Sequence, residues 1–541
     1  MRILVFLMLL LGLKTASAQV DTVWVRNYNG PANSTDKPCA LVVDDTGNVY
    51  VAGYAKGIGT APRDYVTIKY NSFGDSIWVN LYDGPWGGDD YPVGLLLDDA
   101  NNVYVAGASR GIDATFDYAT IKYDDKGDTL WVRHLNGPWA DNDYPAAFTI
   151  DDSSNVYITG ITSLPWTKED YMTVKYNSLG DTSWVRLYDH AGESDSATAI
   201  ATDQAGNIYV TGMSWDYTTR FDYATVKYDA SGTELWVSRF NGLADSTDIA
   251  VAITADSGGD IYVTGASWTA GSGYDIVTVK YNSTGDTIWT RLYNGSSNGD
   301  DIPVAIALDY SGNIYVTGYS TEASIDYCTI RYDPDGNEIW VANYDGKGGG
   351  EDRVYALATD DSCNSYITGA SYGSGTWYDY ATVKYDSSGN EIWVVCYEGV
   401  SNDIAHAIAV DGNGYVYVTG EGRVSGGANI DFVTIKYTQK IGITEEQSWH
   451  TDFLVRVEPN PFRSKTTIRY ALTSRGDVTI AIYNLLGQEI KTLVDEHKSA
   501  GFHQVTWDGK DNEGRQHPPG IYFLQVKTQT ETRTEKLVVL R

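Results

Sequence analysis

Apolar and polar residues alternate over short stretches along most of the chain, with the two-residue period of half-buried β-strands. Three signatures return in a fixed order: a tryptophan strand such as 130–133, a hairpin such as 306–318 that ends in glycine, and Asp-Tyr-x-Thr-x-Lys-Tyr or a close variant. The glycines lie 51 to 54 residues apart, so the pattern predicts repeated copies of one all-β unit. The strand tryptophans are Trp24, Trp78, Trp131, Trp184, Trp236, Trp289, Trp340 and Trp393, and the hairpin glycines are Gly53, Gly107, Gly160, Gly212, Gly265, Gly318, Gly369 and Gly420.

Each unit is predicted to hold four short strands, which we call A to D. In one unit they cover residues 306–309, 313–318, 326–332 and 339–344. The A–B and C–D links are short turns with a glycine available for left-handed geometry, so both are expected to be hairpins. Four antiparallel strands in a repeated unit are typical of a propeller blade.

The two ends of the repeat array complement each other. A tryptophan strand at 23–28 precedes the first strand A, whereas the last unit runs to Tyr437 and then has no tryptophan strand. If the N-terminal strand completes the last sheet, the ring closes and no edge strand is left open. The expected fold is therefore all-β, with an eight-bladed β-propeller over residues 19–438. An open β-solenoid with caps is the alternative, because a repeat period alone does not exclude it.

The repeat also has a recognisable sequence signature. Residues 206–212 are Gly-Asn-Ile-Tyr-Val-Thr-Gly, and Trp236 lies in the strand D of the same unit. These residues resemble the bacterial β-propeller repeat of exported proteins, the SBBP type, and the units match it over residues 22–438. The resemblance implies a propeller, but members of this family are seldom assigned an activity, so it implies little about function.

The first 18 residues have the features of a signal peptide. Arg2 gives a basic start, 3–13 is apolar, and 16–18 are small residues, so cleavage is expected before Gln19. A membrane anchor is the alternative, but the apolar run is shorter than the ~20 residues that a bilayer crossing requires. We expect a mature protein that is soluble outside the cytoplasm, with no transmembrane segment after cleavage.

The net charge of −32 belongs to the repeats, because residues 441–541 carry 13 basic and 13 acidic side chains. A field of that sign repels phosphate backbones, so nucleic acid is not an expected partner. The cysteines show no paired spacing, which argues against a metal knuckle or a redox motif; export permits disulfides between them without demanding any. They are Cys39, Cys328, Cys363 and Cys396.

Three aspartates recur in every unit. An aspartate that one ring needs eight times is expected to accept hydrogen bonds from turn amides. Calcium is an alternative, because the D–A links are rich in carboxylates and glycine, with Asp90 and Asp301 as candidate ligands. Those links lack the twelve-residue helix-flanked calcium motif, so no metal or cofactor is predicted. The set before strand A is Asp36, Asp90, Asp143, Asp195, Asp248, Asp301, Asp352 and Asp403; the set ending strand A is Asp44, Asp98, Asp151, Asp203, Asp256, Asp309, Asp360 and Asp411; the set opening strand C is Asp64, Asp117, Asp170, Asp222, Asp275, Asp326, Asp379 and Asp431.

Antiparallel order places the A–B and C–D turns at one end of the propeller and the B–C and D–A links at the other. The second end varies in length and sequence and is rich in aromatic residues, which on a rigid scaffold suits binding of a carbohydrate or a protein. The alternative is that some of these tryptophans simply cover the blade ends. The candidate ligand-binding residues are Trp86, Trp139, Trp166, Trp215, Trp268 and Trp377, with Tyr217, Tyr274 and Tyr372 beside them.

Enzyme chemistry finds little support in the sequence. The histidines share no spacing with a candidate nucleophile, and there is no Gly-x-Ser-x-Gly, His-Glu-x-x-His or phosphate-loop motif. No catalytic residue is predicted. Carboxylate pairs are common in so acidic a propeller, so a hydrolase using carboxylates in the central channel stays as an alternative.

A second domain is predicted after a linker at 439–452. Alternating strands are expected at 465–471, 478–484, 503–507, 521–527 and 535–540, as in a small immunoglobulin-like β-sandwich covering 453–541. A generic spacer of this type is one interpretation.

Four motifs in this domain point to a more specific interpretation: Pro-Asn-Pro-Phe at 459–462, 483–489, 519–523 and 536–539. Together they resemble the C-terminal sorting domain of type IX secretion substrates, in its type A variety, and 506–511 resembles the immunoglobulin-like domain of flagellar hook-capping proteins. The departure is at Pro518-Pro519-Gly520, where the sorting family more often has a small residue between the proline-like turn and the glycine. The resemblance implies export through the periplasm by the type IX machinery, with sorting residues Pro459, Asn460, Pro461, Gly487, Glu489, Gly520, Tyr522 and Lys536.

The expected function is that of a secreted or surface-attached monomer that binds a carbohydrate or protein through the variable end of its propeller, with the C-terminal domain as its address. A structural surface-coat component without a specific ligand is the alternative from a different class, and the hydrolase is the third.

Overall fold

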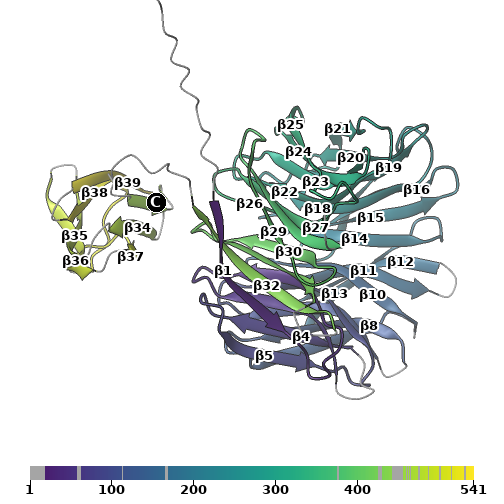
Figure 1. Ribbon diagram of the computed structural model, residues 1–541, viewed down its shortest axis with the longest axis horizontal. Coiled ribbons are helices and arrows are strands. Elements are labelled where there is room, and N and C mark those ends of the chain that lie inside the picture. The colour runs from purple at the N-terminus through teal and green to yellow at the C-terminus, as the bar shows by residue number, and fades with distance from the viewer. Residues whose placement is uncertain are drawn as a thin grey trace, which may run out of the picture. The chain divides into compact units, whose positions relative to one another are not determined.

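The computed structural model describes residues 19–57, 63–111, 114–139, 141–164, 168–373, 377–423, 429–440, 455–458, 460, 462, 465–472, 476–484, 487–498, 501–512, 514–528 and 532–540. Two compact units, 1–442 and 443–541, divide the chain, and we describe each by itself. All regular elements in the described part are β-strands (Figure 1). That part contains no helix with the length and apolarity that a membrane crossing requires.

The first unit is an eight-bladed propeller in which every blade is a four-stranded antiparallel sheet. Strand A is β2 (Lys37–Val43), β6 (Asp90–Leu97), β10 (Asp143–Ile150), β14 (Asp195–Thr202), β18 (Asp248–Ala255), β22 (Asp301–Leu308), β26 (Arg353–Thr359) and β30 (Ile404–Val410). Strand B is β3 (Val49–Lys56), β7 (Val103–Arg110), β11 (Val156–Leu164), β15 (Ile208–Asp216), β19 (Ile261–Thr269), β23 (Ile314–Thr321), β27 (Ser365–Tyr372) and β31 (Val416–Gly422). Strand C is β4 (Arg63–Tyr70), β8 (Phe116–Tyr123), β12 (Lys168–Tyr176), β16 (Arg220–Tyr228), β20 (Gly273–Tyr281), β24 (Ile325–Tyr332), β28 (Tyr378–Tyr385) and β32 (Asp431–Lys440). Strand D is β5 (Ser76–Tyr82), β9 (Thr129–Leu135), β13 (Thr182–Tyr188), β17 (Glu234–Phe240), β21 (Thr287–Tyr293), β25 (Glu338–Tyr344) and β29 (Glu391–Tyr397). We number the blades 1 to 8 from β2.

The N-terminal strand closes the ring. In Figure 1, β1 (Gln19–Tyr28, purple) lies beside β32 (green), and the two pair antiparallel with Trp24 opposite Lys436. Strand A of each blade contacts strand A of the next, and β2 contacts β30 across the junction of blades 8 and 1. The predicted closure is therefore confirmed, and the open solenoid is wrong.

The strand-D tryptophans fasten neighbouring blades to each other. Seven of the eight indole Nε1 atoms donate a hydrogen bond into the C–D link of the next blade, as Trp78 does to the carbonyl oxygen of Asp125 at 3.1 Å. The eighth, Trp393, donates to Gln439 Oε1 of β32 at 3.2 Å. Trp24 of blade 8 makes the equivalent bond to Ser72 of blade 1 at 3.3 Å. The strand-C lysines add to these contacts: Lys175 Nζ donates to Ala230 O of the next blade at 3.0 Å. The tryptophan and the lysine of the repeat are thus contacts between blades.

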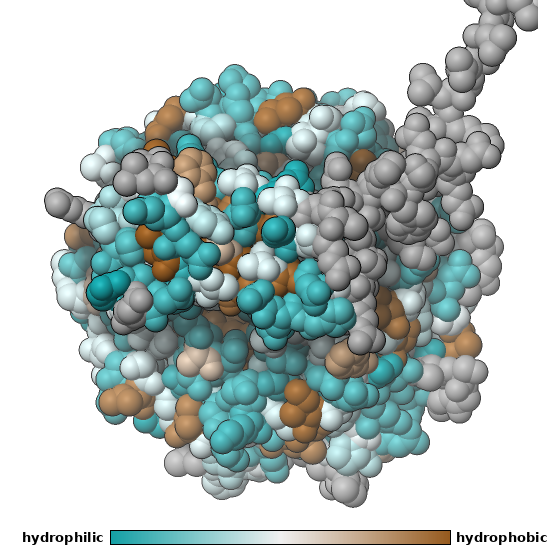
Figure 2. Space-filling model, turned by 90° about the vertical axis from the view of Figure 1, so that its left-hand side faces the viewer, coloured by the Kyte–Doolittle hydropathy of each residue, from teal (hydrophilic) through white to brown (hydrophobic). Residues whose placement is uncertain are grey.

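The antiparallel strand order places the A–B and C–D turns at one end of the propeller and the B–C and D–A links at the other. We call the end with the A–B and C–D turns the turn end, and the end with the B–C and D–A links the loop end. On the face of the molecule drawn in Figure 2, apolar residues lie in small separate groups among hydrophilic ones.

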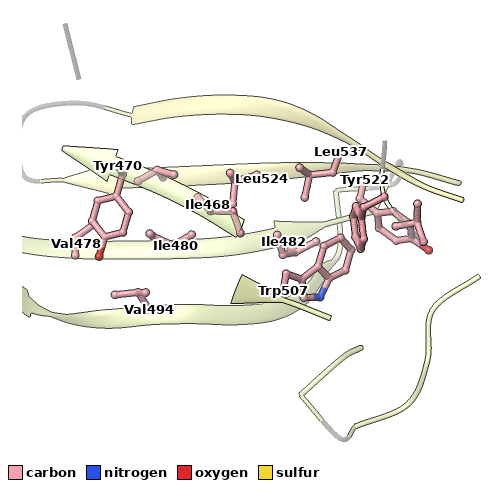
Figure 3. Close-up of a cluster of buried hydrophobic side chains, with 13 residues drawn as sticks. Ile468, Tyr470, Val478, Ile480, Ile482, Val494, Trp507, Tyr522, Leu524 and Leu537 are labelled. Atoms are coloured by element: carbon pink, nitrogen blue, oxygen red, sulfur yellow. The ribbon is translucent and has the colours of Figure 1, made fainter. Parts of the chain in front are cut away.

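The second unit is a sandwich of two sheets. One has the order β33 (Val455–Glu458), β34 (Thr466–Leu472), β37 (Gly501–Trp507). The other has the order β36 (Glu489–Lys498), β35 (Gly476–Tyr483), β38 (Gly520–Thr528), β39 (Thr532–Val539). Between them lies a core that includes Trp507, Leu524 and Leu537, all fully buried (Figure 3).

The sequence did not predict β36. It is an edge strand with only Val494 buried, and its other positions include Glu489, Lys491, Asp495 and Lys498. An edge strand tolerates charged residues on both faces, which removes the alternation that identifies a buried strand.

Candidate ligand-binding face

The exposed tryptophans predicted for ligand binding lie at the loop end. Trp86 and Trp139 occupy equivalent positions in the D–A links that lead into blades 2 and 3, and their side chains are 58% and 51% exposed. Trp377, in the B–C link of blade 7, is 68% exposed. Trp166 lies outside the described residues. Three of the six candidates are thus large apolar side chains that face solvent.

The other two candidates are partly covered. Trp215 is the residue before the end of β15, and it packs edge-on against Phe221 with ring centroids 4.9 Å apart. Trp268, near the end of β19, is 37% exposed and lies opposite Tyr274 in the strand pairing. The interpretation that some tryptophans cover the blade ends is therefore correct for Trp215, whose ring serves the hairpin of its own blade.

The structure brings together a set of rings at the loop end that the sequence did not single out. Tyr54, Tyr91, Phe116 and Tyr144 form a ladder across blades 1 to 3, with successive ring centroids 5.5, 5.9 and 5.3 Å apart. Tyr91 and Tyr144 are the second residues of β6 and β10, both strands A, and Phe116 opens β8, a strand C. We call this ladder, together with Trp86 and Trp139 of the two intervening links, the aromatic sector.

Arginines accompany the ladder. The Arg63 guanidinium carbon lies 5.5 Å from the centre of the Tyr54 ring and 5.6 Å from that of Tyr91, and Nη1 donates to Tyr91 Oη at 2.7 Å. Arg110 lies 5.7 Å from the centre of the Phe116 ring. The aromatic sector therefore combines exposed ring surface with hydrogen-bond donors held in place by cation–π contacts.

Equivalent positions in other blades explain why only part of the loop end is aromatic. The second residue of strand A is Tyr91 in blade 2 and Tyr144 in blade 3, but Ser196, Ile249 and Ile302 in blades 4 to 6. The ladder is thus a local departure from the repeat. A comparison of units position by position in the sequence would have found it.

Two of the three aspartate sets hold turns, as predicted. Every member of the set that ends strand A accepts hydrogen bonds from the amides two and four residues later, as Asp98 does from Ala100 and Asn102 at 3.0 and 2.9 Å. It also accepts from a strand-B tyrosine, here Tyr104 at 3.0 Å. Despite burial, these hydrogen bonds hold the pKa of Asp98 below its ordinary value.

The set before strand A caps the D–A link in the same way. Asp90 accepts from Gly84 N at 2.7 Å and from Arg110 N at 3.2 Å, and it is fully buried. Burial raises its pKa to about 6, although the two amide bonds oppose the shift.

The set that opens strand C behaves differently. Three of its members accept hydrogen bonds from side chains: Asp222 from Arg239, Asp275 from Ser272 and Asp326 from Ser324. Asp64 Oδ1 is buried with no hydrogen-bond partner. The prediction of turn capping is therefore wrong for Asp64, Asp222, Asp275 and Asp326.

The two calcium candidates have different surroundings. Asp90 lies with Asp64 and Asp83 in a group whose carboxylate oxygens are within 4.8 Å of one another. Asp301 is in no such group of three among the described residues and accepts from Gly295 N at 2.6 Å.

A cavity of about 400 Å³ opens at the turn end between blades 3 and 4. Its walls include Asp151, Asp203, Lys175 and Gln204. Both aspartates are already engaged in their own turns, through Asn155 N and Asn207 N at 2.9 Å each. Sequence variation and exposed rings favour the loop end over this cavity as the ligand-binding surface.

The four cysteines are free thiols, and burial raises the pKa of Cys39 and of Cys328 to about 12. Such thiols stay protonated and are poor nucleophiles and poor metal ligands at neutral pH.

In the C-terminal unit, residues of the four motifs contribute to the sandwich. Asn460 Nδ2 donates to Lys536 O at 2.6 Å and Asn460 Oδ1 accepts from Val538 N at 2.8 Å, so the first motif holds the last strand. Gly487 turns with φ of 75°, and Tyr522 Oη donates to Pro518 O at 2.7 Å. Glu489 opens β36 and Gly520 opens β38, while Pro459 and Pro461 lie outside the described residues.

Comparison with protein families gives two matches. Residues 183–217, 288–326 and 392–425 match the "Beta-propeller repeat" (SBBP) model, and 462–532 match the "FlgD Ig-like domain" model. One curated relative, an uncharacterized WD repeat-containing protein of Acanthamoeba polyphaga mimivirus, is 22% identical over 399 residues. That alignment covers 61% of this chain and 28% of the relative's length.

Solved structures of several propeller proteins are similar at low scores. They include PorZ, a surface component of the type IX secretion system of Porphyromonas gingivalis (13% identity, TM-score 0.34, covering 93% of this chain and 74% of that one). Another is a puromycin hydrolase, at 13% identity and a TM-score of 0.42, with 73% of this chain and 60% of that one covered. A third is the propeller domain of the Trilobed protease from Pyrococcus furiosus, at 10% identity and a TM-score of 0.34, with 66% of this chain and 94% of that one covered. Enzymes and non-enzymes both occur among them. The fold assignment rests on the strand pairing of this chain.

Proposed function

We propose that this protein is an exported propeller that binds a carbohydrate through the aromatic sector of its loop end. The observation that carries the proposal is the ladder of Tyr54, Tyr91, Phe116 and Tyr144 beside the exposed Trp86 and Trp139, with Arg63 and Arg110 against the rings.

A carbohydrate suits the chemistry of this surface. The C–H faces of a sugar ring pack on exposed aromatic faces, and its hydroxyls need closely spaced donors and acceptors. The aromatic sector offers both, because Arg63 also lies 3.7 Å from Asp89 and the carboxamide oxygen of Asn142 accepts from Phe116 N. A protein ligand would use many of the same residue types, so it is kept as an outcome of the test.

Changing Trp86 and Trp139 together to alanine is expected to weaken binding of the recognised glycan at least tenfold, since each change removes an exposed ring from the contact. The measurement is a glycan array with the wild-type protein, followed by calorimetric titration of the best glycan. The matched control removes two exposed aromatic residues from the turn end, Phe73 and Tyr310, which are 76% and 81% exposed.

Equal weakening in the control pair would contradict the assignment of the loop end. If the array shows no glycan and pull-down instead recovers a protein whose binding needs Trp86 and Trp139, the surface is retained and the ligand class changes to protein.

We further propose that residues 453–541 address the protein to the type IX secretion machinery after a signal peptide directs it to the periplasm. The support is the set of four motifs and the sandwich to which they contribute, in which Asn460 and Tyr522 make the contacts described above.

Deleting residues 453–541 is expected to leave the propeller folded but retained in the periplasm, because it is a separate compact unit. Fractionation of cells that make the full-length or the truncated chain measures this. The control replaces 453–541 with an unrelated immunoglobulin-like domain. Surface or extracellular recovery of the truncated chain would show that the domain is a spacer.

A further inference from the structure

The junction of blades 1 and 2 holds three carboxylates from three different segments. Asp64 belongs to β4, Asp83 to the link between β5 and β6, and Asp90 opens β6. One oxygen of each lies within 4.8 Å of the others. Two oxygens bound to one Ca²⁺ are at most about 4.6–5.2 Å apart, twice the usual Ca–O distance, so the three can share one ion.

Asp64 is the member of the cluster that lacks a partner. It is 9% exposed, and its Oδ1 is buried without a hydrogen bond. Asp83 and Asp90 each place a carboxylate oxygen within 4.8 Å of an oxygen of Asp64, so this buried carboxylate lies among groups of the same charge. A buried carboxylate among like charges requires a cation or a proton.

Blade 4 shows how the chain itself supplies a cation at the equivalent place. There Asp222 accepts from Arg239 Nη2 at 3.0 Å. Arg239 pairs with Ala224 in its sheet, and the residue in the same register of blade 1 is Leu81, which pairs with Val66. Blade 1 therefore has a leucine where blade 4 has the guanidinium that neutralises the aspartate.

The position of Asp83 also varies between blades. It is asparagine in four D–A links, namely Asn29, Asn136, Asn241 and Asn294. Two other D–A links have aspartate at this position, Asp189 and Asp345. Each belongs to an equivalent group of three carboxylates, Asp170–Asp189–Asp195 and Asp326–Asp345–Asp352. In the second of these groups, Ser324 Oγ donates a hydrogen bond to Asp326 at 2.6 Å. Of the strand-C aspartates in the three groups, Asp64 is the one that has no hydrogen bond or ion pair among the described residues.

We propose that Asp64, Asp83 and Asp90 bind a divalent cation, with Ca²⁺ favoured, that fastens blade 1 to blade 2. Asp90 is held in place by Gly84 N and Arg110 N, and Asp83 is exposed, so the ion has both a preformed ligand and a route of entry. Water and loop carbonyls complete a coordination shell of six to eight oxygens, as is usual for Ca²⁺.

The test uses the full chain after chelation, titrated with CaCl2 and with MgCl2 by calorimetry and followed by thermal unfolding. We expect Ca²⁺ to raise the Tm by about 3 °C at one hundred times its Kd. Asp83→Asn introduces the asparagine that four other D–A links carry at this position. This variant is expected to bind one Ca²⁺ fewer than the wild type and to lose the part of the Tm increase that comes from this site. Asp128→Asn makes the same charge change at an exposed residue of the turn end and is expected to bind like the wild type.

Leu81→Arg is a second, independent variant. It is expected to remove the same Ca²⁺ site while raising the Tm of the chelated protein, because the guanidinium takes the place of the ion. Equal stoichiometry and equal Ca²⁺ shifts in the wild type and Asp83→Asn would overturn the proposal, and so would the absence of any Ca²⁺ or Mg²⁺ binding by the wild type; Asp64 is then neutralised by a proton.

Discussion

A chain that begins at residue 29, without β1, is expected to be recovered as aggregate or as soluble oligomers. The loss of β1 exposes the edge of β32 from Phe432 to Lys440. It also removes two hydrogen bonds between blades 8 and 1, from Trp24 to Ser72 O at 3.3 Å and from Arg26 to Gly74 O at 2.6 Å. An open edge of that length pairs with other chains, and the ring loses its contact between blades 8 and 1. Light scattering after size-exclusion chromatography measures the outcome.

The matched control keeps every residue and changes only the connection. A permuted chain carries residues 19–28 directly after Lys440, joined by a short glycine-containing turn, because Gln19 lies opposite Lys440 in the sheet. Blade 8 then has the ordinary A-B-C-D order of the other blades, and this protein should be monomeric. A truncated chain that is monomeric and melts within a few degrees of the full-length protein would show that β1 does not close the ring.

The propeller could be predicted because every level of the sequence repeats. The two-residue period predicted the strands, and the turn glycines predicted the hairpins. The extra strand D before the first unit and the missing strand D of the last unit predicted the closure between β1 and β32. Strand lengths were less well predicted: β22 begins at Asp301 rather than at 306, because a bulge between Pro303 and Ala305 interrupts the alternation there.

Sequence analysis predicted the carboxylate cluster and the aromatic sector only in part, because both contain residues from more than one blade. Asp90 was a candidate, but Asp64 and Asp83 join it only when β4, the D–A link and β6 meet at the blade junction. The ladder likewise combines Tyr54 of blade 1 with Tyr91 of blade 2. Such contacts between units depend on how blades pack, which a repeat pattern does not specify.

The recurring glycine of strand B has a different role from the one that the sequence suggested. It was interpreted as the end of the hairpin, yet β15 continues past Gly212 to Asp216. Opposite Gly212, strand A has a bulge between Ala197 and Ala199, which brings its backbone close. Glycine in the middle of a strand is typical of such a close approach, because any side chain would meet the neighbouring backbone.

Gly212→Ala is therefore expected to lower the free energy of unfolding of the propeller by about 3 kcal/mol or more, which is the upper end of the usual cost of overpacking. The cost is high because the atoms that the new methyl group would meet include backbone atoms, which cannot rotate away as a side chain can. The new Cβ would lie 2.8 Å from Ala197 Cα and 2.8 Å from Tyr171 Oη of blade 3, and nearer still to the Ser196 carbonyl oxygen. Gly192→Ala is the matched control: its φ is 66° and nothing lies within 4 Å of the added Cβ, so only backbone strain of about 1 kcal/mol applies. Urea unfolding of both variants measures the difference between their free energies of unfolding. If both variants lose the same free energy, the bulge in β14 shifts to admit the methyl group, and blade geometry does not require glycine at this position.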